Sequence, residues 1–197
     1  MSAMTAMLLS ALAVWLTGSG TPVFRRLKLT RAAGIVIAAL WLAAGLLPPL
    51  RINEVYIGLQ GFVLPLFLGV GYASWCSLWR QPQAVRLFLA VIAVRIGLDL
   101  LLPAADGPYG APECLIMVLL AVLLADRPQV RFGTLLLGLP LGDMGIEVLR
   151  LLCDQQADIR LGGTHASALV VASLLGLMLW LGAEAFLTGV KCKKGPI

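Results

Sequence analysis

The sequence predicts an all-α fold, a polytopic bundle of seven transmembrane helices with its N-terminus outside and its C-terminus in the cytoplasm. Of the 197 residues, 60% are hydrophobic and 13% are charged, whereas a soluble domain is about half apolar and about a quarter charged. The apolar residues form long, uniform runs without the alternation of a β-barrel strand. At about 20 residues for each crossing, the chain allows six or seven helices and leaves no room for a soluble domain, so residues 1–197 are predicted to form one integral membrane domain.

Proline, glycine and threonine residues mark the expected ends of these helices. A Thr-Gly-Ser-Gly turn ends the first run, Thr30 is a possible N-cap of the second, and Pro48-Pro49 and Pro103 follow later runs. Pro65 and Pro140 fall inside runs, and Pro65 is expected to kink its helix. The predicted helices span residues 3–16, 32–47, 55–78, 84–102, 112–125, 132–152 and 164–190.

The basic residues alternate between the two sides of this bundle. Eleven lie in the segments that would face the cytoplasm and three in those that would face outside, and Arg95 lies inside a helix. This asymmetry predicts localisation in the inner (cytoplasmic) membrane with the stated orientation, and adding or removing one helix would break it. The first 24 residues carry no Lys or Arg, so we expect an uncleaved first helix rather than a signal peptide. The three outer basic residues are Arg51, Arg150 and Arg160.

Two predicted helices carry charged residues within the membrane. Inserting one charged side chain there costs about 2.5–3.5 kcal/mol. Arg95 and Asp99 are spaced i, i+4 on the fourth helix, and Asp143 and Glu147 have the same spacing on the sixth, with Arg150 one turn further. Arg95 and Asp143 each lie 11 residues from their helix start, about 16 Å along the helix. We therefore expect Arg95 to contact Asp99, Asp143 or both in the outer half of the membrane.

Two interpretations of this candidate intramembrane polar site remain open. One is an internal ion pair that fixes the order of the helices, and the other is a site lining a cavity open to the outside. His165, the single histidine, follows Gly162-Gly163 at the outer start of the seventh helix. It is either a solvated capping residue or a member of the same cluster that titrates near neutral pH.

No motif for catalysis or metal binding is visible. The chain has no nucleophile elbow, no HExxH and no GxGxxG, so we predict no enzyme and no cofactor. Its four cysteines are far apart and are expected to pack as small apolar residues, but if a disulfide forms it should join Cys114 to Cys153, which both fall near the outer surface. The net charge of +5 comes from clusters between apolar runs, which indicates membrane topology rather than a nucleic-acid partner.

Several short motifs resemble a family of bacterial and archaeal membrane proteins of unknown function. They are the segments 24–30 (FRRLKLT), 52–53 (IN), 61–66 (GFVLPL), 142–143 (GD) and 161–163 (LGG). In order and spacing they resemble domain-of-unknown-function family sixteen-fourteen, and in size and hydropathy the chain is also similar to the YphA-type small membrane proteins of spore-forming bacteria. The first family's pattern continues with an acidic residue that is absent from Thr164-His165-Ala166-Ser167-Ala168. Neither resemblance implies a reaction.

Two functional hypotheses follow from the residues. The chain is either a small-solute or ion-coupled transporter that uses the polar site, or a non-catalytic membrane scaffold that assembles with partners. A titrating Asp143 reached by solvent would favour the transporter. A charge network fully closed upon itself, together with an exposed apolar groove, would favour the scaffold. The lipid bilayer is the partner that both hypotheses share.

Overall fold

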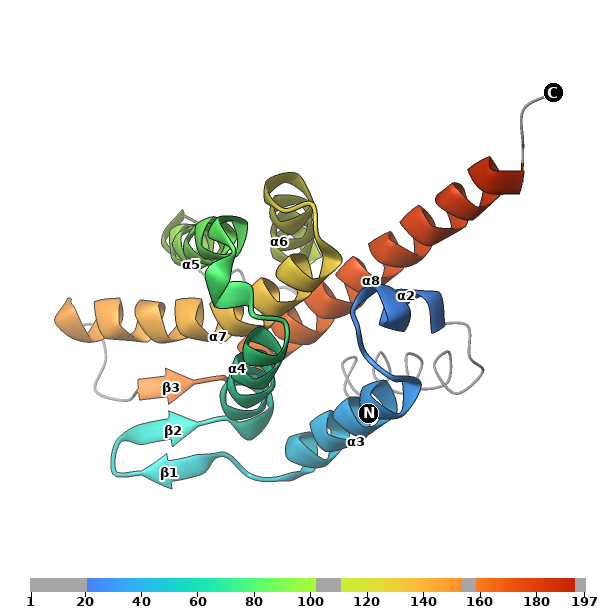
Figure 1. Ribbon diagram of the computed structural model, residues 1–197. Helices are drawn as coiled ribbons and strands as arrows, with labels where there is room; N and C mark the ends of the chain where they lie inside the picture. The colour runs from blue at the N-terminus through green and yellow to red at the C-terminus, as the bar shows by residue number, and fades with distance from the viewer. Residues whose placement is uncertain (1–20, 102–110, 154–158, 194–197) are drawn as a thin grey trace.

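The computed structural model describes residues 21–101, 111–153 and 159–193, and it is mostly helical (Figure 1). The predicted first helix, 3–16, lies outside these residues. Within the described residues, seven α-helices and three short β-strands occur. The predicted helical class is therefore correct, but the purely helical fold is not.

The first described helices form a short hairpin. Helix α2 (Thr21–Arg26) occupies a segment expected to be a loop, and α3 (Arg31–Leu46) follows it. The Thr30 hydroxyl accepts a hydrogen bond from the Ala33 backbone N–H at 3.1 Å, which confirms the predicted N-cap. Gly34 lets α3 approach α2, because a Cβ there would lie 2.5 Å from the Phe24 ring.

The predicted helix 55–78 begins later than expected. Strands β1 (Leu50–Ile52) and β2 (Val55–Ile57) form an antiparallel hairpin, followed by a π-helical turn η1 (Leu59–Val63) and helix α4 (Leu64–Trp75). Pro65 lies where η1 passes directly into α4, inside the continuous apolar helix Leu59–Trp75. The kink expected at Pro65 stays a prediction.

A third strand completes a small sheet that the sequence analysis missed. Strand β3 (Ile159–Leu161) pairs in parallel with β2, giving the order β1-β2-β3. Each strand has only three residues, which is too short for a period-2 pattern to stand out between apolar helices. Figure 1 shows the sheet beside the C-terminal half of α7.

Helix α7 (Pro128–Leu152) is the most buried element, and the other long helices pack around it. Helix α5 (Pro82–Leu101) lies on its glycines, since a Cβ at Gly138 or Gly142 would meet Val91 or Arg95 at under 3 Å. Glycine at these two positions therefore allows α5 and α7 to approach closely. A 3₁₀ turn, η2 (Leu78–Arg80), lies between α4 and α5. The two remaining helices are α6 (Ala111–Leu124) and α8 (Thr164–Lys193).

One described helix is long and apolar enough to cross a bilayer, judged by length and composition. It is the part of α8 from Thr164 to Leu187, with a mean hydropathy of 2.1. The apolar segments Arg31–Leu46, Leu59–Trp75 and Pro112–Leu124 are shorter. A helical fold with one possible span is therefore what the structure supports, and the multi-pass arrangement is a proposal developed below.

Candidate functional site

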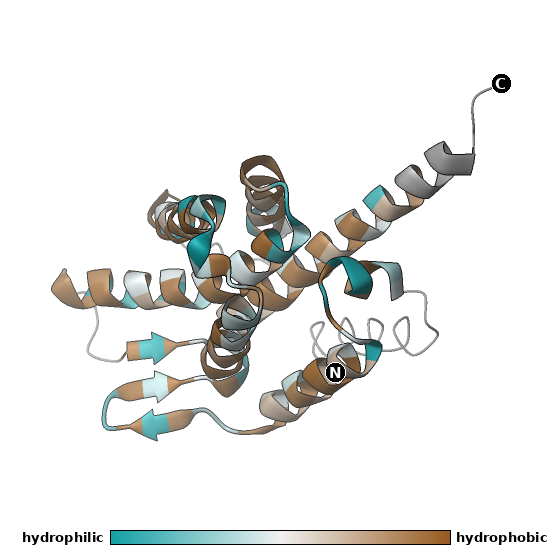
Figure 2. Cartoon of the chain, viewed as in Figure 1, coloured by the Kyte–Doolittle hydropathy of each residue, from teal (hydrophilic) through white to brown (hydrophobic). Residues whose placement is uncertain are grey.

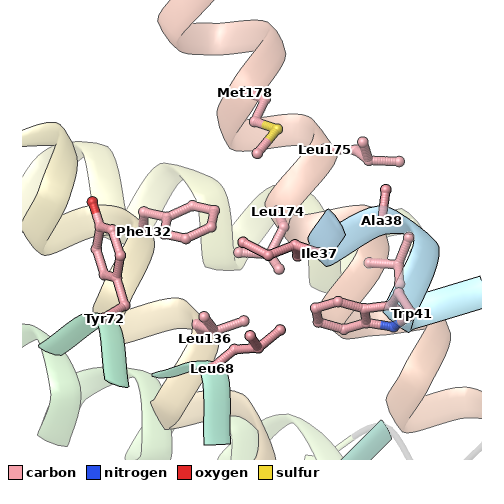
Figure 3. Close-up of a pocket in the computed structure, with 11 residues that line it drawn as sticks. Ile37, Ala38, Trp41, Leu68, Tyr72, Phe132, Leu136, Leu174, Leu175 and Met178 are labelled. Atoms are coloured by element: carbon pink, nitrogen blue, oxygen red, sulfur yellow. The ribbon is translucent and has the colours of Figure 1, made fainter. Parts of the chain in front are cut away.

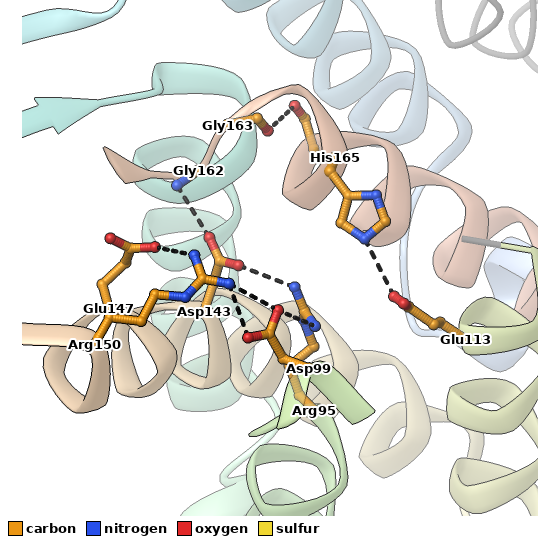
Figure 4. Close-up of polar contacts among 10 residues, drawn as sticks. Arg95, Asp99, Glu113, Asp143, Glu147, Arg150, Gly162, Gly163 and His165 are labelled. Atoms are coloured by element: carbon orange, nitrogen blue, oxygen red, sulfur yellow. Dashed lines mark hydrogen bonds and ion pairs between the residues drawn. The ribbon is translucent and has the colours of Figure 1, made fainter. Parts of the chain in front are cut away.

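The predicted contact between the charges of α5 and α7 is present (Figure 4). Nη2 of Arg95 lies 3.2 Å from Oδ1 of Asp143, and Nη1 lies 4.0 Å from Oδ1 of Asp99. The Arg95 side chain is only 4% exposed. Because Gly142 removes a side chain where α5 and α7 touch, the Arg95 stem fits against the α7 backbone. The expectation that Arg95 contacts Asp99 and Asp143 is thus confirmed.

Arg150 is a second bridge between the same helices. It is more exposed than Arg95, with 34% of its side chain accessible against 4%. Its Nη2 lies 2.8 Å from Oδ2 of Asp99 and its Nη1 lies 3.0 Å from Oε1 of Glu147. Glu147 and Arg150 share a helix face at i, i+3, whereas Asp99 reaches across from α5. Two guanidinium groups, rather than one, therefore balance the three carboxylates.

Backbone N–H groups from the sheet region complete the cluster. The Gly162 N–H donates to Oδ2 of Asp143 at 3.1 Å, and the Arg160 N–H donates to Oε2 of Glu147 at 3.1 Å. Every carboxylate oxygen of the three acidic residues now has a donor within this network. We call the set Arg95, Asp99, Asp143, Glu147 and Arg150 the charge clamp, because it joins α5, α7 and the end of β3.

Glycines allow the β3–α8 connection to reach the clamp. Gly162 has φ +66, a left-handed conformation that side chains disfavour. A Cβ at Gly61 would lie 2.6 Å from the carbonyl oxygen of Gly162, and one at Gly58 would overlap that oxygen. The Gly58 N–H also donates to the Leu161 carbonyl at 2.8 Å. The segment before α4 therefore supports Gly162 from the side opposite Asp143.

His165 does not join the clamp. Its Nε2 lies 3.3 Å from Oε2 of Glu113 in the first turn of α6, and its side chain is 54% exposed. Figure 4 shows the imidazole pointing toward Glu113 and away from Arg95 and Asp143. The alternative that grouped His165 with the acidic cluster was wrong, because the ring leaves α8 on the side that faces α6.

A second ion cluster, absent from the sequence analysis, lies near the start of α7. The buried Arg131 places Nη1 3.1 Å from Oε1 of Glu184 and donates through Nε to the Ala125 carbonyl at 2.7 Å. Arg26 and the Trp180 indole also contact Glu184. Glu184 is a charged residue inside the predicted helix 164–190. That position could have indicated a buried ion pair from the sequence alone.

Two cavities between described residues bear on the hypotheses, and Asp143 lines neither of these two. One, of about 70 Å³, is apolar and lies between α3, α4, α7 and α8 (Figure 3). Trp41 lies at its edge, and the buried Trp41 Nε1 has no hydrogen-bond partner among the described residues. The other, of about 530 Å³, lies between the end of α3, the sheet and the start of α8.

The described cysteines are unpaired, and the described His, Cys, Asp and Glu side chains form no metal site. Cys76, Cys114 and Cys153 are free, so the disulfide suggested for Cys114 and Cys153 is not formed. The side chain of Cys192 lies outside the described part of α8. Within the described residues, no group of three His, Cys, Asp or Glu side chains has a geometry that could hold a metal ion.

Comparison with protein-family models, curated proteins and solved structures finds no match for this chain. The resemblance to family sixteen-fourteen, and the weaker one to the YphA-type proteins, therefore stay predictions. The function has to be inferred from the geometry of the clamp, the sheet and the cavities.

Proposed function

We propose that the chain is a multi-pass inner-membrane protein that acts as a non-catalytic scaffold, with the charge clamp holding the outer sheet against the helices. The grouping of the loops supports the membrane part of this proposal. Segments predicted to be cytoplasmic meet near the start of α7, where Gln129 donates to the Arg26 carbonyl and Gln83 donates to Asp126. Segments predicted to be outside meet elsewhere, through the β2–β3 pairing and the His165–Glu113 contact.

The apolar surface supports the same proposal. Large hydrophobic side chains point away from the core on α4, α5, α6 and α8, and Phe67 and Leu123 are 74% and 79% exposed. Figure 2 shows apolar colouring along most of these helices, with hydrophilic residues at the loops and strands. Contiguous apolar surface of this kind is unfavourable in water and favourable in hydrocarbon. Lipid is the partner that would cover it.

The scaffold function rests on one observation: the carboxylates of the charge clamp are fully hydrogen-bonded within the network. All six carboxylate oxygens of Asp99, Asp143 and Glu147 accept hydrogen bonds from neighbouring guanidinium or backbone N–H groups. A transported cation or solute would have to displace one of these donors. Buried, fully satisfied polar networks fix one arrangement of the elements that they join. The apolar cavity beside Trp41 is small and lined mostly by buried residues, so it is not the exposed groove that the scaffold hypothesis names, and the closed network alone supports the scaffold.

One observation favours transport as a second candidate. Three carboxylates face two guanidinium groups, which leaves one negative charge in excess if all are ionised. A proton or a cation would neutralise that excess. The two candidates differ in what removing a single charge should do to stability.

Neutralising Asp143 separates the candidates. The Asp143→Asn side chain keeps one acceptor but turns an NH₂ group toward either Arg95 or the Gly162 N–H, so one buried donor loses its acceptor. We expect a loss of about 2 kcal/mol, or about 4–8 °C in unfolding midpoint in detergent. Asp126→Asn, at an exposed hydrogen bond to Gln83, is the matched control and should change the midpoint by less than about 2 °C. A more stable Asp143→Asn protein would favour a transport site kept at a cost to stability.

Topology reporters test the membrane part. Fusions after Gln83 or Arg127 should report the cytoplasm, because both lie in basic segments that meet near the start of α7. A fusion inserted at Asn53, in the β1–β2 turn, should report the exterior. If the Asn53 and Arg127 reporters fell on the same side, the multi-pass proposal would be rejected.

A further inference from the structure

The connection between α4 and α5 is a tight corner that is anchored on α7. Helix α4 ends at Trp75, and Ser77 then adopts a left-handed conformation with φ 51, which turns the chain into η2. Leu78 is buried beneath this turn. Gly133 of α7 makes room for it, because a Cβ there would overlap the Leu78 side chain. The residues that follow Leu78 are therefore held in one place on the surface.

An aromatic ring and two arginines lie together on the exposed side of this corner. Trp79 is 56% exposed, and Arg80 and Arg86 are exposed as well. The Trp79 ring packs edge-on against Phe88 of α5, with 6.4 Å between the ring centres. Since Arg86 lies two residues before Phe88, this contact brings Trp79 to the part of α5 that carries Arg86.

A third arginine joins the corner from the start of α7. Nη1 of Arg127 lies 3.5 Å from Oε1 of Gln81, the residue after Arg80. The partner is a neutral amide, so the contact positions Arg127 without cancelling its charge. We call the set Trp79, Arg80, Arg86 and Arg127 the basic corner.

The positive charge of the basic corner exceeds the negative charge beside it. Residues 75–90 contain no Asp or Glu, and residues 121–131 contain only Asp126, which accepts a hydrogen bond from Gln83. Within the described residues, none of the ion pairs includes Arg80, Arg86 or Arg127. Three guanidinium groups and one carboxylate leave two positive charges in excess. The surface therefore suits an anionic partner.

The partner must also cover an apolar stripe that begins at the basic corner. Val85, Leu89 and Leu100 on α5 are 44%, 59% and 69% exposed. With the exposed Ala93 they follow Arg86 at the three- and four-residue spacing of one helix face. From Arg86 to Leu100 the stripe is about 21 Å long, and the hydrocarbon of one leaflet is about 15 Å thick. A nucleic acid or an acidic peptide would leave this stripe uncovered, whereas an anionic lipid covers both parts.

We propose that the basic corner binds the headgroup of an anionic phospholipid, whose acyl chains lie along the exposed face of α5. The guanidinium groups of Arg80 and Arg86 match the phosphate oxygens in charge and in donor geometry. Trp79 has an apolar body and one N–H donor, which is the character of side chains at headgroup level. Placing the corner at the cytoplasmic leaflet, which is rich in anionic lipid, rests on the proposed function.

The test is a titration of the purified full chain in a neutral maltoside detergent at constant ionic strength. Short-chain phosphatidylglycerol is the probe, and the unfolding midpoint reports binding. Arg80→Gln/Arg86→Gln should weaken binding by about tenfold or more, because two charges near the headgroup are lost. Arg80→Lys/Arg86→Lys keeps both charges and should lose less. If the glutamine variant lacks a cooperative transition, Arg86→Gln alone gives the same comparison at an exposed position.

The matched control is Arg25→Gln/Lys28→Gln, which removes two exposed charges from another segment predicted to be cytoplasmic. It should change the affinity by less than about twofold. An equal loss in both pairs would show diffuse attraction to all basic residues and would overturn the proposed site.

Two further ligands test the chemistry of the occupant. Short-chain phosphatidylcholine, which is zwitterionic, and inorganic phosphate, which has no acyl chain, should each bind at least about tenfold more weakly than phosphatidylglycerol. Equal binding of phosphatidylcholine would overturn the requirement for an anion, and equal binding of inorganic phosphate would overturn the lipid. No saturation by phosphatidylglycerol would overturn the site itself. The topology reporters use no added lipid, so failure of this site and failure of the membrane proposal are distinguishable.

Discussion

Replacing Arg95 with leucine is expected to destabilise the protein by about 3–5 kcal/mol, the usual result of removing one partner of a buried ion pair. The change leaves Asp143 with only the Gly162 N–H and leaves Asp99 with Arg150. Arg95→Leu/Asp143→Leu should lose less than Arg95→Leu alone, because it leaves no uncompensated carboxylate at that position. The remaining loss comes from the Gly162 N–H, which no longer has an acceptor.

The readout is a double-mutant cycle on unfolding midpoints in detergent, completed by Asp143→Leu. A coupling of about 1–3 kcal/mol is expected for residues in direct contact. Arg86→Leu, an exposed arginine on the same helix, is the control and should cost less than about 0.5 kcal/mol. Additive losses for Arg95 and Asp143 would mean that the two residues are not coupled, and the clamp would have to be abandoned.

Gly58→Ala is the second change with a large expected effect. Its Cβ would overlap the carbonyl oxygen of Gly162 and lie 2.9 Å from the carbonyl carbon. Both are backbone atoms of a segment held by Asp143, so neither can move without breaking the clamp or the sheet. We expect a loss of about 3 kcal/mol or more, at the upper end of the cost of overpacking.

Gly71→Ala is the matched control for that experiment. A Cβ at Gly71 would meet nothing within 4 Å, and the residue lies inside α4. Alanine in a helix is favoured over glycine by about 0.5–1 kcal/mol, so this variant should be as stable as the parent protein or slightly more stable. A Gly58→Ala protein with an unchanged midpoint would show that the sheet is not held as tightly as the geometry requires.

The sequence predicted the parts of the fold that are encoded by long, uniform runs of apolar residues. The apolar runs gave most of the helices to within a few residues, and the matching positions of Arg95 and Asp143 anticipated the contact between α5 and α7. The strands were missed because three residues carry too little pattern.

Only the side-chain contacts of the charge clamp could be predicted from the sequence, and its backbone donors could not. Arg95, Asp99 and Asp143 were grouped by depth, but the donors from Gly162 and Arg160 are backbone N–H groups, which carry no sequence signal. Arg150 is more exposed than Arg95, as its position one turn further along suggested, but the sequence did not show that Asp99 reaches it from α5. Whether the network is closed or open therefore depended on backbone geometry that only the structure provides.

Amide hydrogen exchange of the β3–α8 connection tests the clamp most directly. The measurement compares the peptide that contains residues 159–163 in the parent protein, in Asp143→Asn/Glu147→Gln and in the control Asp126→Asn. If the carboxylates hold this backbone, the Arg160 and Gly162 amides should be protected in the parent protein. They should exchange about tenfold faster or more in the clamp variant, because each amide side chain offers one neutral oxygen, for which the neighbouring guanidinium group competes, in place of two charged ones. The His165–Glu113 contact and the Asp126→Asn protein should remain unaffected. Equal exchange of this peptide in all three proteins would contradict the clamp, and with it the proposed scaffold function.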